Sequence, residues 1–485
     1  MRPDEHGTPP TPASRPRRRH ALALAALMAL TLAAGAAARL PFTEVARDAV
    51  PPTVGSASDA IHMTAQLDRG SVLRNGDGSL RAELVIGAKA GDLSLAERVP
   101  TDLVVILDRS GSMQGPPLDF AKAAVGELIE QLAGEDRFAL VSYASAGEVA
   151  IPLALATPDT RSHWRQRISA ISANGGTNLA QGLDLAHSLI AGARQAGRVP
   201  RVILLSDGHA NEGDHSLAGL RSRAGRAISG EYVLSSVGIG SGFDEALMSA
   251  VADAGTGNFY YLPDLTNLAG VFSAEFASAR ETIASALEVV IAPGEGVTVE
   301  SASGYPLERD GETVRLRPGD LASGQERRIW ITLRVPTGVE GEIALGELSL
   351  RYRDTGGQPH DLALPELPRV ACVAGEDDYY ASFEPEIYLR GSRSEGLGQL
   401  KQKVARSLRS GDQAEAVSEV DHFMADLKNE QLRALGYVDA QAFAPAESLR
   451  DSVAAPSAAH APAQNRLGKQ LLEEGRDLRR AGSKR

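Results

Sequence analysis

The chain has 485 residues, of which 43% are hydrophobic and 23% charged, so it carries enough apolar material for several folded domains. Its 62 acidic and 50 basic residues give a net charge of -12. This balance argues against nucleic acid as a partner, because phosphate binding depends on concentrated positive charge. The single cysteine, Cys372, excludes an intramolecular disulfide and cysteine-rich metal sites, and we expect it to be buried as a small apolar side chain.

Residues 1–39 have the three parts of an export signal. Basic residues 15–20 precede the apolar tract 21–38, which ends in small residues. Cleavage after Ala38 is the preferred interpretation, and an uncleaved N-terminal anchor is the alternative, because the tract is at the short end of what spans a bilayer. We therefore expect an exported protein of the periplasm or cell envelope, secreted or attached to the membrane only through this segment.

The next segment, residues 40–99, is expected to hold a tether and then the first β-strands. Residues 61–67 and 80–86 alternate apolar and polar side chains, which is typical of half-buried strands.

From about residue 100 to residue 283 the pattern changes to that of an α/β domain. Continuous apolar runs, typical of strands covered on both faces, alternate with helical patterns. Strands are predicted at 103–107, 138–143, 201–206, 232–238 and 258–262, and helices at 118–132, 164–171, 179–193, 216–229 and 244–254. The first helix is expected to bury Phe120, Ala124, Leu128 and Leu132. This order indicates a doubly wound, mostly parallel, Rossmann-like sheet with its binding crevice at the carboxyl ends of the strands.

The rest of the chain is expected to form two further parts and a tail. Strand patterns and turns over 284–375 predict an antiparallel β-sandwich, with which the strands before Thr101 should pair, so that the α/β domain is inserted in it. A small helical region is predicted over 376–441, and a Pro/Ala linker with a basic tail over 442–485. We expect this tail to be solvated, with membrane headgroups or an acidic partner as the alternative.

Oxygen-bearing side chains follow two of the predicted strands. Asp108, Ser110 and Ser112 come directly after the strand 103–107, Asp207 directly follows the strand 201–206, and Thr177 precedes a helix. We expect the three loops to converge on one divalent cation, because carboxylate and hydroxyl oxygens suit Mg²⁺, with Ca²⁺ or Mn²⁺ also compatible. Helix capping by the same serines and aspartates is the simpler alternative for each loop taken alone.

These motifs resemble the metal-ion-dependent adhesion site of von Willebrand factor type A domains. The resemblance covers about 101–283 and includes Leu204–Gly213 and Gly255–Tyr261. It implies direct coordination by Ser110, Ser112 and Thr177, with Asp108 and Asp207 acting through water or weakly. Together with the β region, the chain resembles bacterial exported proteins often called calcium-activated chloride channel homologues, and distantly the heavy chains of inter-alpha-trypsin inhibitor. Arg109 departs from the family pattern, and we expect it to point to solvent.

The resemblance implies a non-enzymatic, metal-dependent protein-binding module that captures an Asp or Glu carboxylate of a protein partner. Hydrolase, zinc-protease and nucleotide-binding motifs are missing, and His209 is expected to be a surface loop residue. Two alternatives stay open: a structural envelope scaffold with a non-essential metal site, and an accessory subunit of an ATPase complex. The sequence leaves the partner's identity and the oligomeric state open.

Overall fold

The computed structural model describes residues 54–58, 60–90, 99–364, 367–455 and 460–480. The chain divides into Met1–Ala49 and Val50–Arg485, and all described residues belong to the second unit. The expected export signal and most of the tether therefore lie outside the described residues.

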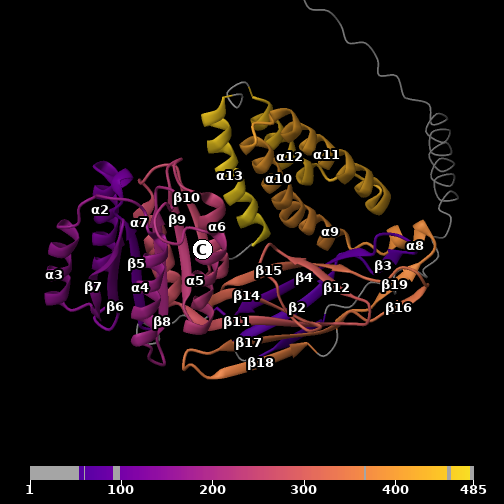
Figure 1. Ribbon diagram of the computed structural model, residues 1–485. Coiled ribbons are helices and arrows are strands. Elements are labelled where there is room, and N and C mark those ends of the chain that lie inside the picture. Colours follow the sequence, from indigo (N-terminus) through magenta and orange to yellow (C-terminus); the bar gives the residue numbers. More distant parts are fainter. Residues whose placement is uncertain (1–53, 59, 91–98, 365–366, 456–459, 481–485) are drawn as a thin grey trace, which may run out of the picture. The chain divides into compact units, whose positions relative to one another are not determined.

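An α/β domain is built on a sheet with the strand order β10-β9-β8-β5-β6-β7 (Figure 1). The strands are β5 Thr101–Asp108, β6 Arg137–Tyr143, β7 Gly147–Leu155, β8 Val199–Ser206, β9 Val233–Ile239 and β10 Thr256–Leu262. All neighbours are parallel except β7, which runs antiparallel to β6 at the edge. Every residue of the central strand β5 is buried, as its continuous apolar run predicts.

Helices cover both faces of this sheet. They are α2 Pro116–Gln131, α3 Pro158–Ser169, α4 Leu179–Gly192, α5 Leu217–Gly230, α6 Glu245–Ala254 and α7 Leu268–Arg280. Successive β5 side chains alternate between the faces, because strand side chains have a period of two. Leu103, Val105 and Leu107 pack with α2, α3 and α7. Val104 and Ile106 pack with α4, α5 and α6.

Three details of this domain differ from the sequence-based expectation. The edge strand β7 and the helix α7 were not expected at all. Within α2, Phe120 is 51% exposed, and the helix buries Leu118, Ala121 and Val125 together with the expected Ala124 and Leu128. The helix is thus rotated so that a stripe of aliphatic residues, rather than Phe120, faces the sheet.

The β region is a sandwich of two antiparallel sheets, with orders β1-β2-β4-β15-β12 and β13-β14-β11-β17-β18. The strands are β1 Val54–Ala57, β2 Ile61–Leu67, β4 Ser79–Ala88, β11 Thr282–Pro293, β12 Thr298–Ala302, β13 Glu308–Asp310, β14 Thr313–Ala322, β15 Glu326–Arg334, β17 Gly346–Arg353 and β18 Pro359–Leu364. A small third sheet joins β16 Gly341–Ile343, β19 Val370–Val373 and β3 Ser71–Leu73.

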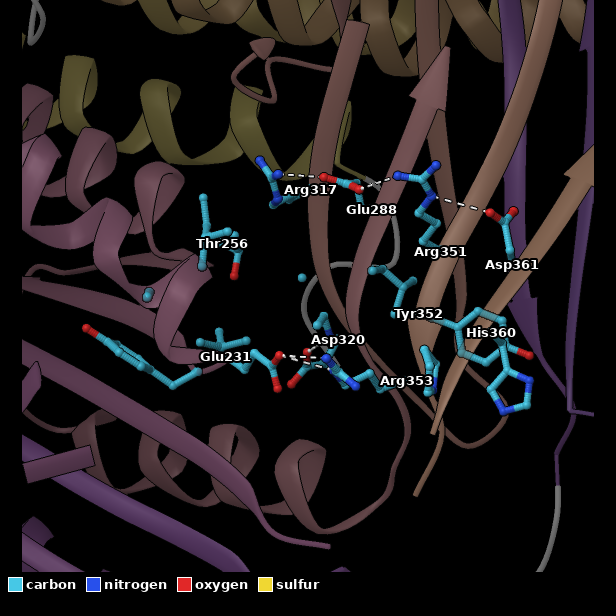
Figure 2. A pocket seen from close by; sticks show the side chains of 18 residues that line it. Glu231, Thr256, Glu288, Arg317, Asp320, Arg351, Tyr352, Arg353, His360 and Asp361 are labelled. Carbon is cyan, nitrogen blue, oxygen red and sulfur yellow. Dashed lines mark hydrogen bonds and ion pairs between the residues drawn. The ribbon is translucent and has the colours of Figure 1, made fainter. Parts of the chain in front are cut away.

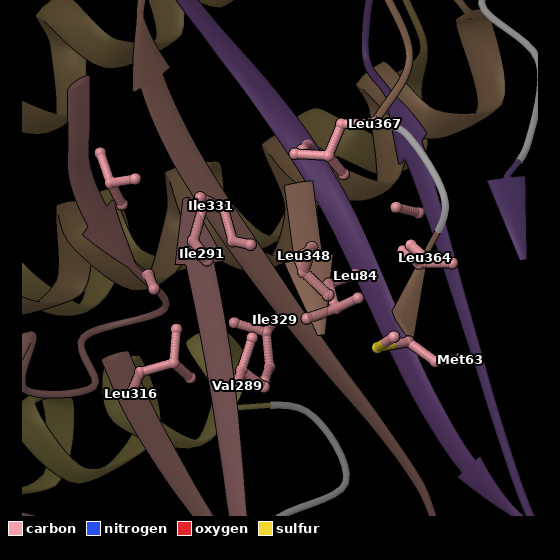
Figure 3. Close-up of a cluster of buried hydrophobic side chains, with 14 of the residues drawn as sticks. Met63, Leu84, Val289, Ile291, Leu316, Ile329, Ile331, Leu348, Leu364 and Leu367 are labelled. Carbon is pink, nitrogen blue, oxygen red and sulfur yellow. The ribbon is translucent and has the colours of Figure 1, made fainter. Parts of the chain in front are cut away.

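One apolar core holds the sandwich together (Figure 3). Met63 and Leu84 from the first sheet meet Val289, Ile291 and Leu348 from the second, and all five are at most 2% exposed. Cys372 is 3% exposed and belongs to the same core, as expected for a small apolar side chain. Because β4 pairs with β15 along its length, strands on both sides of the α/β domain share one sheet, which confirms the predicted insertion.

The C-terminal part is helical. It contains α8 Glu376–Ala381, α9 Pro385–Gly391, the π-helical turn η3 Ser392–Gly396, α10 Leu397–Arg409, α11 Gln413–Leu435, α12 Ala440–Ala454 and α13 Ala461–Arg479.

The prediction that a Pro/Ala linker begins at residue 442 is wrong, because α12 runs through this stretch to Ala454. Ala442, Ala446, Leu449 and Val453 of α12 are buried at helical spacing, so an alanine-rich stripe that looked like linker composition is a packed helix face. The expectation of a solvated basic tail is wrong for α13, because Lys469 and Arg476 are only 3% and 6% exposed. Residues 456–459 and 481–485 lie outside the described residues.

Candidate metal centre

The parallel pairing of β5 with β8 places Asp108 and Asp207 side by side at the carboxyl ends of these strands. Leu107 lies opposite Leu205 in the register, so both chains leave the sheet side by side. The loop that precedes α4 joins them there, since the Gly111 N–H donates to the Gly175 carbonyl at 3.0 Å and the Asn174 N–H donates to the Arg109 carbonyl at 2.9 Å. Three loops from distant parts of the sequence therefore lie together at the carboxyl ends of these strands.

Asp108 is the most deeply buried group of the site, with 0% exposure. Its Oδ1 accepts the Ser110 N–H at 2.8 Å, and its Oδ2 accepts the Tyr143 hydroxyl at 3.1 Å and the Ser206 hydroxyl at 3.0 Å. Burial raises the pKa of this carboxyl, although these hydrogen bonds favour its ionised form. The groups that chiefly set this pKa are hydroxyls and a backbone N–H rather than cationic side chains, so a bound cation would supply countercharge that they do not.

The two serines connect the first loop to Asp207. The Ser110 and Ser112 hydroxyl oxygens are 3.1 Å apart, and Ser112 donates to Asp207 Oδ1 at 2.7 Å. Burial, and then the nearby charge of Asp108, raise the pKa of Asp207. The structure thus gathers four of the five predicted ligands into one hydrogen-bonded group.

Thr177 lies on the third loop and is 4% exposed. Asn211 holds its backbone on both sides: the Thr177 N–H donates to Asn211 Oδ1 at 2.8 Å, and the Asn211 N–H donates to the Thr177 carbonyl at 3.1 Å. Among the described residues the Thr177 hydroxyl forms no hydrogen bond with the other four predicted ligands. Its place in the site therefore rests on the loop contacts rather than on a direct bond.

The chemistry of these side chains fits a hard divalent cation. All five offer oxygen, which Mg²⁺, Ca²⁺ and Mn²⁺ prefer. In the described part of the chain, no three or more His, Cys, Asp or Glu side chains gather where they could hold a metal. This finding is compatible with the site, because it has only two carboxylates and its other ligands would be hydroxyls.

Arg109 does not point to solvent as expected. Its side chain is 15% exposed and lies 3.7 Å from Glu148. It donates to Asn174 Oδ1 at 2.7 Å and to the Ser142 hydroxyl at 3.3 Å. These partners lie on β6, on β7 and on the loop before α4, and they hold the Arg109 side chain beside the site. His209 is exposed, as expected.

Sequence reasoning missed the supporting roles of Tyr143, Ser206 and Asn211. Ser206 and Tyr143 end strands adjacent to Asp108, and their position at the carboxyl ends of predicted strands was the available signal. Asn211 lies in a loop and gave no such signal.

A cavity at the other end of the sheet, where β9 and β10 begin, is a separate feature (Figure 2). It has a volume of about 460 Å³ and lies between the start of β9 and β10 and the sandwich. The charges that line it are paired with one another: Arg317 with Glu288 at 2.5 Å, and Arg353 with Glu231 at 3.1 Å. Because these charged side chains already pair with one another, we take the oxygen cluster at the carboxyl ends of the strands as the candidate site.

A family model for the von Willebrand factor type A domain matches residues 102–274, the range that contains the whole oxygen cluster. The chain contains a von Willebrand factor type A (VWA) domain. VWA domains serve generally in protein interaction or adhesion and often bind a divalent cation.

Similar proteins come from distantly related organisms. An uncharacterized protein of Synechocystis is 25% identical over 300 residues, covering 59% of this chain and 69% of the relative. The uncharacterized protein YfbK of Escherichia coli is 28% identical over 213 residues, covering 44% of this chain and 37% of the relative. Inter-alpha-trypsin inhibitor heavy chain H4 of Bos taurus is 26% identical over 160 residues, 32% of this chain but only 18% of the relative. The match thus spans less than two thirds of the last two.

Solved structures share the fold beyond the VWA domain. The von Willebrand factor type A protein from Catenulispora acidiphila aligns with a TM-score of 0.61 and 20% identity over 80% of this chain and 93% of its own. The ArnB paralog VWA2 from Sulfolobus acidocaldarius aligns with a TM-score of 0.55 and 13% identity over 87% of this chain and 99% of its own. Both alignments confirm the fold class.

Proposed function

We propose that this chain is a metal-dependent protein-binding module, in which Asp108, Ser110, Ser112, Thr177 and Asp207 hold a Mg²⁺-type ion that captures a carboxylate of a protein partner. The observation that carries the proposal is the hydrogen-bonded chain from Ser110 through Ser112 to Asp207, beside the buried carboxylate of Asp108. These are the contacts expected of ligands that share one cation.

Each residue has a distinct part in this proposal. The hydroxyls of Ser110, Ser112 and Thr177 are neutral and would bind the ion directly. The carboxylates of Asp108 and Asp207 would bind it through intervening water molecules. A bound ion would supply Lewis acidity toward an incoming carboxylate. Mg²⁺ is the favoured ion because the oxygen ligands are few and small, and Ca²⁺ or Mn²⁺ would be alternatives.

The proposed module is non-enzymatic. Ser112 donates to a carboxylate rather than to a histidine, so the hydrogen bond that activates a nucleophilic serine is not made by this residue. Its proposed location is the cell envelope or periplasm, which rests on the sequence of residues 1–39. Among the described residues, no helix combines the length and the apolar character needed to cross a membrane.

Calorimetric titration with Mg²⁺ tests the metal half of the proposal. We expect saturable binding by the wild-type chain and at least about tenfold weaker binding by Ser110→Ala, because one ligand is lost. Ser188→Ala, an exposed hydroxyl on α4, is the matched control and should bind as wild type does. Equal Mg²⁺ affinity in the wild type and in Ser110→Ala would overturn the proposed site.

Selection of displayed random peptides tests the partner half. Peptides retained in Mg²⁺ and released by a chelator should be enriched in Asp or Glu, and the Ser110→Ala variant should retain few of them. Retention that is unaffected by the chelator would show binding of another kind and contradict carboxylate capture.

A further inference from the structure

The basic C-terminal helix α13 is buried against the VWA domain, where it contacts both ends of α6. At the start of α6, Lys469 lies 3.1 Å from Glu245, and at its end Arg476 and Arg480 each lie 2.7 Å from Asp253. Glu245 is 4% exposed, so the first of these pairs is excluded from solvent. Such groups are stable in the interior only when paired, so α13 and α6 hold one another in place.

Lys469 also holds the loop that leads into α6. Its Nζ donates to the Phe243 carbonyl at 2.6 Å and lies 3.9 Å from the centre of the Phe243 ring. The ring packs between Phe259 and Tyr261, at centroid distances of 6.2 and 5.8 Å. It also covers Gly238, where an added Cβ would lie only 2.2 Å from it. The loop is therefore fixed from outside by α13 and from inside by the sheet.

The same loop lies against the candidate metal ligand Asp207. A Cβ added at Gly242 would come within 2.9 Å of the Asp207 carbonyl oxygen. Gly242 directly precedes Phe243, whose carbonyl accepts the hydrogen bond from Lys469. The chain of contacts thus runs from α13 through the loop 240–244 to Asp207.

We propose that Lys469 is a positioning residue for the metal centre, and that α13 sets its metal affinity by holding the loop 240–244 against Asp207. The inference rests on the proposed function, since it concerns the same site. Its physical basis is that a site whose ligands move by about 0.5 Å or more from the productive geometry loses affinity. The helix contributes no ligand of its own.

The test compares Lys469→Met with Lys401→Met, a control that removes the 2.5 Å ion pair between Lys401 and Glu474 on the α10 side of α13. Calorimetric Mg²⁺ affinity and the thermal midpoint in chelator are measured for each. We expect Mg²⁺ binding about fivefold or more weaker in Lys469→Met, and binding within about twofold of wild type in Lys401→Met. An unchanged affinity in Lys469→Met would overturn the inference while leaving the proposed function intact.

Hydrogen exchange of the wild-type chain provides a second readout that needs no variant. Because coupling between sites is reciprocal, Mg²⁺ should slow amide exchange in the loop 240–244 and in α13 around Lys469. Slowing confined to the three loops of the site would overturn the inference. Failure of the wild type to bind Mg²⁺ at all would overturn both proposals.

Discussion

At the scale of single residues, the site depends on how the buried Asp108 carboxylate is supported. Tyr143 has 0% exposure and donates both to Asp108 Oδ2 and, at 2.9 Å, to the Leu205 carbonyl. It thereby bridges the two strands whose ends carry the site. A buried acceptor that loses one of its donors loses free energy of folding, since water cannot replace the hydrogen bond.

Tyr143→Phe should therefore destabilise the metal-free chain by about 1–3 kcal/mol. Urea denaturation in the presence of a chelator measures this change in the free energy of unfolding. Tyr437→Phe, whose ring is 51% exposed, is the control and should change it little. A Tyr143→Phe chain as stable as the control would contradict the supporting role given to this hydroxyl.

The candidate ligands themselves could be predicted from the sequence, because Asp108 and Asp207 directly follow recognisable strands. The partners of Asp108 could not, since they depend on which strands are neighbours and in what register. Arg109 shows the same limit: its polar partners, Ser142 on β6 and Asn174 on the loop before α4, approach it only in the folded chain.

At the scale of elements, α10 and α13 cross at a point where both carry glycine. A Cβ at Gly475 would lie 2.7 Å from the Gly398 carbonyl oxygen, and a Cβ at Gly398 would lie 2.7 Å from that of Gly475. The backbones can approach this closely only because neither residue has a side chain. Close packing of the two helices, rather than helix propensity, accounts for glycine at these two positions.

Gly475→Ala should consequently destabilise the chain by about 1–3 kcal/mol, because backbone must move to admit the methyl group. Gly126→Ala in α2, where an added Cβ meets nothing within 4 Å, should stabilise it by about 0.5–1 kcal/mol. Thermal unfolding of the two variants measures the sign of each change in stability. The same sign for both would contradict the close crossing of α10 and α13.

Strongly patterned elements were predictable and weakly patterned ones were not. The apolar run of β5 identified a central strand directly. The helix α7 was missed although Leu268, Phe272, Phe276 and Ala279 are buried at helical spacing, and α12 was hidden by its alanine-rich composition. The stripe of α7 was readable in the sequence, whereas that of α12 becomes apparent only when the surface that it covers is known.

At the scale of the whole described unit, ion pairs link the C-terminal helix to the VWA domain. Burial opposes ionisation of Asp253, but the guanidinium groups of Arg480 and Arg476 outweigh it, and the pKa of this carboxyl lies below its ordinary value. A lowered carboxyl pKa stabilises the fold above the unfolded-state pKa of about 4 and ceases to do so as pH falls through the folded-state value.

Asp253→Asn should accordingly lower the free energy of unfolding near neutral pH by about 3 kcal/mol, since it removes the carboxylate that pairs with two buried guanidinium groups. The difference from wild type should shrink as the pH falls below about 4. Urea denaturation over a series of pH values measures it. A stability difference that stays constant through the acid range would show that Asp253 stabilises the fold through packing rather than through its charge.

The central claim, that these side chains bind a divalent cation, is tested most directly by anomalous diffraction from crystals of the chain grown with Mn²⁺. The account predicts one strong anomalous peak within coordination distance of the Ser110, Ser112 and Thr177 hydroxyls, and no such peak in Ser110→Ala crystals. Wild-type crystals with no peak at these residues, or with the peak at another place on the molecule, would contradict it.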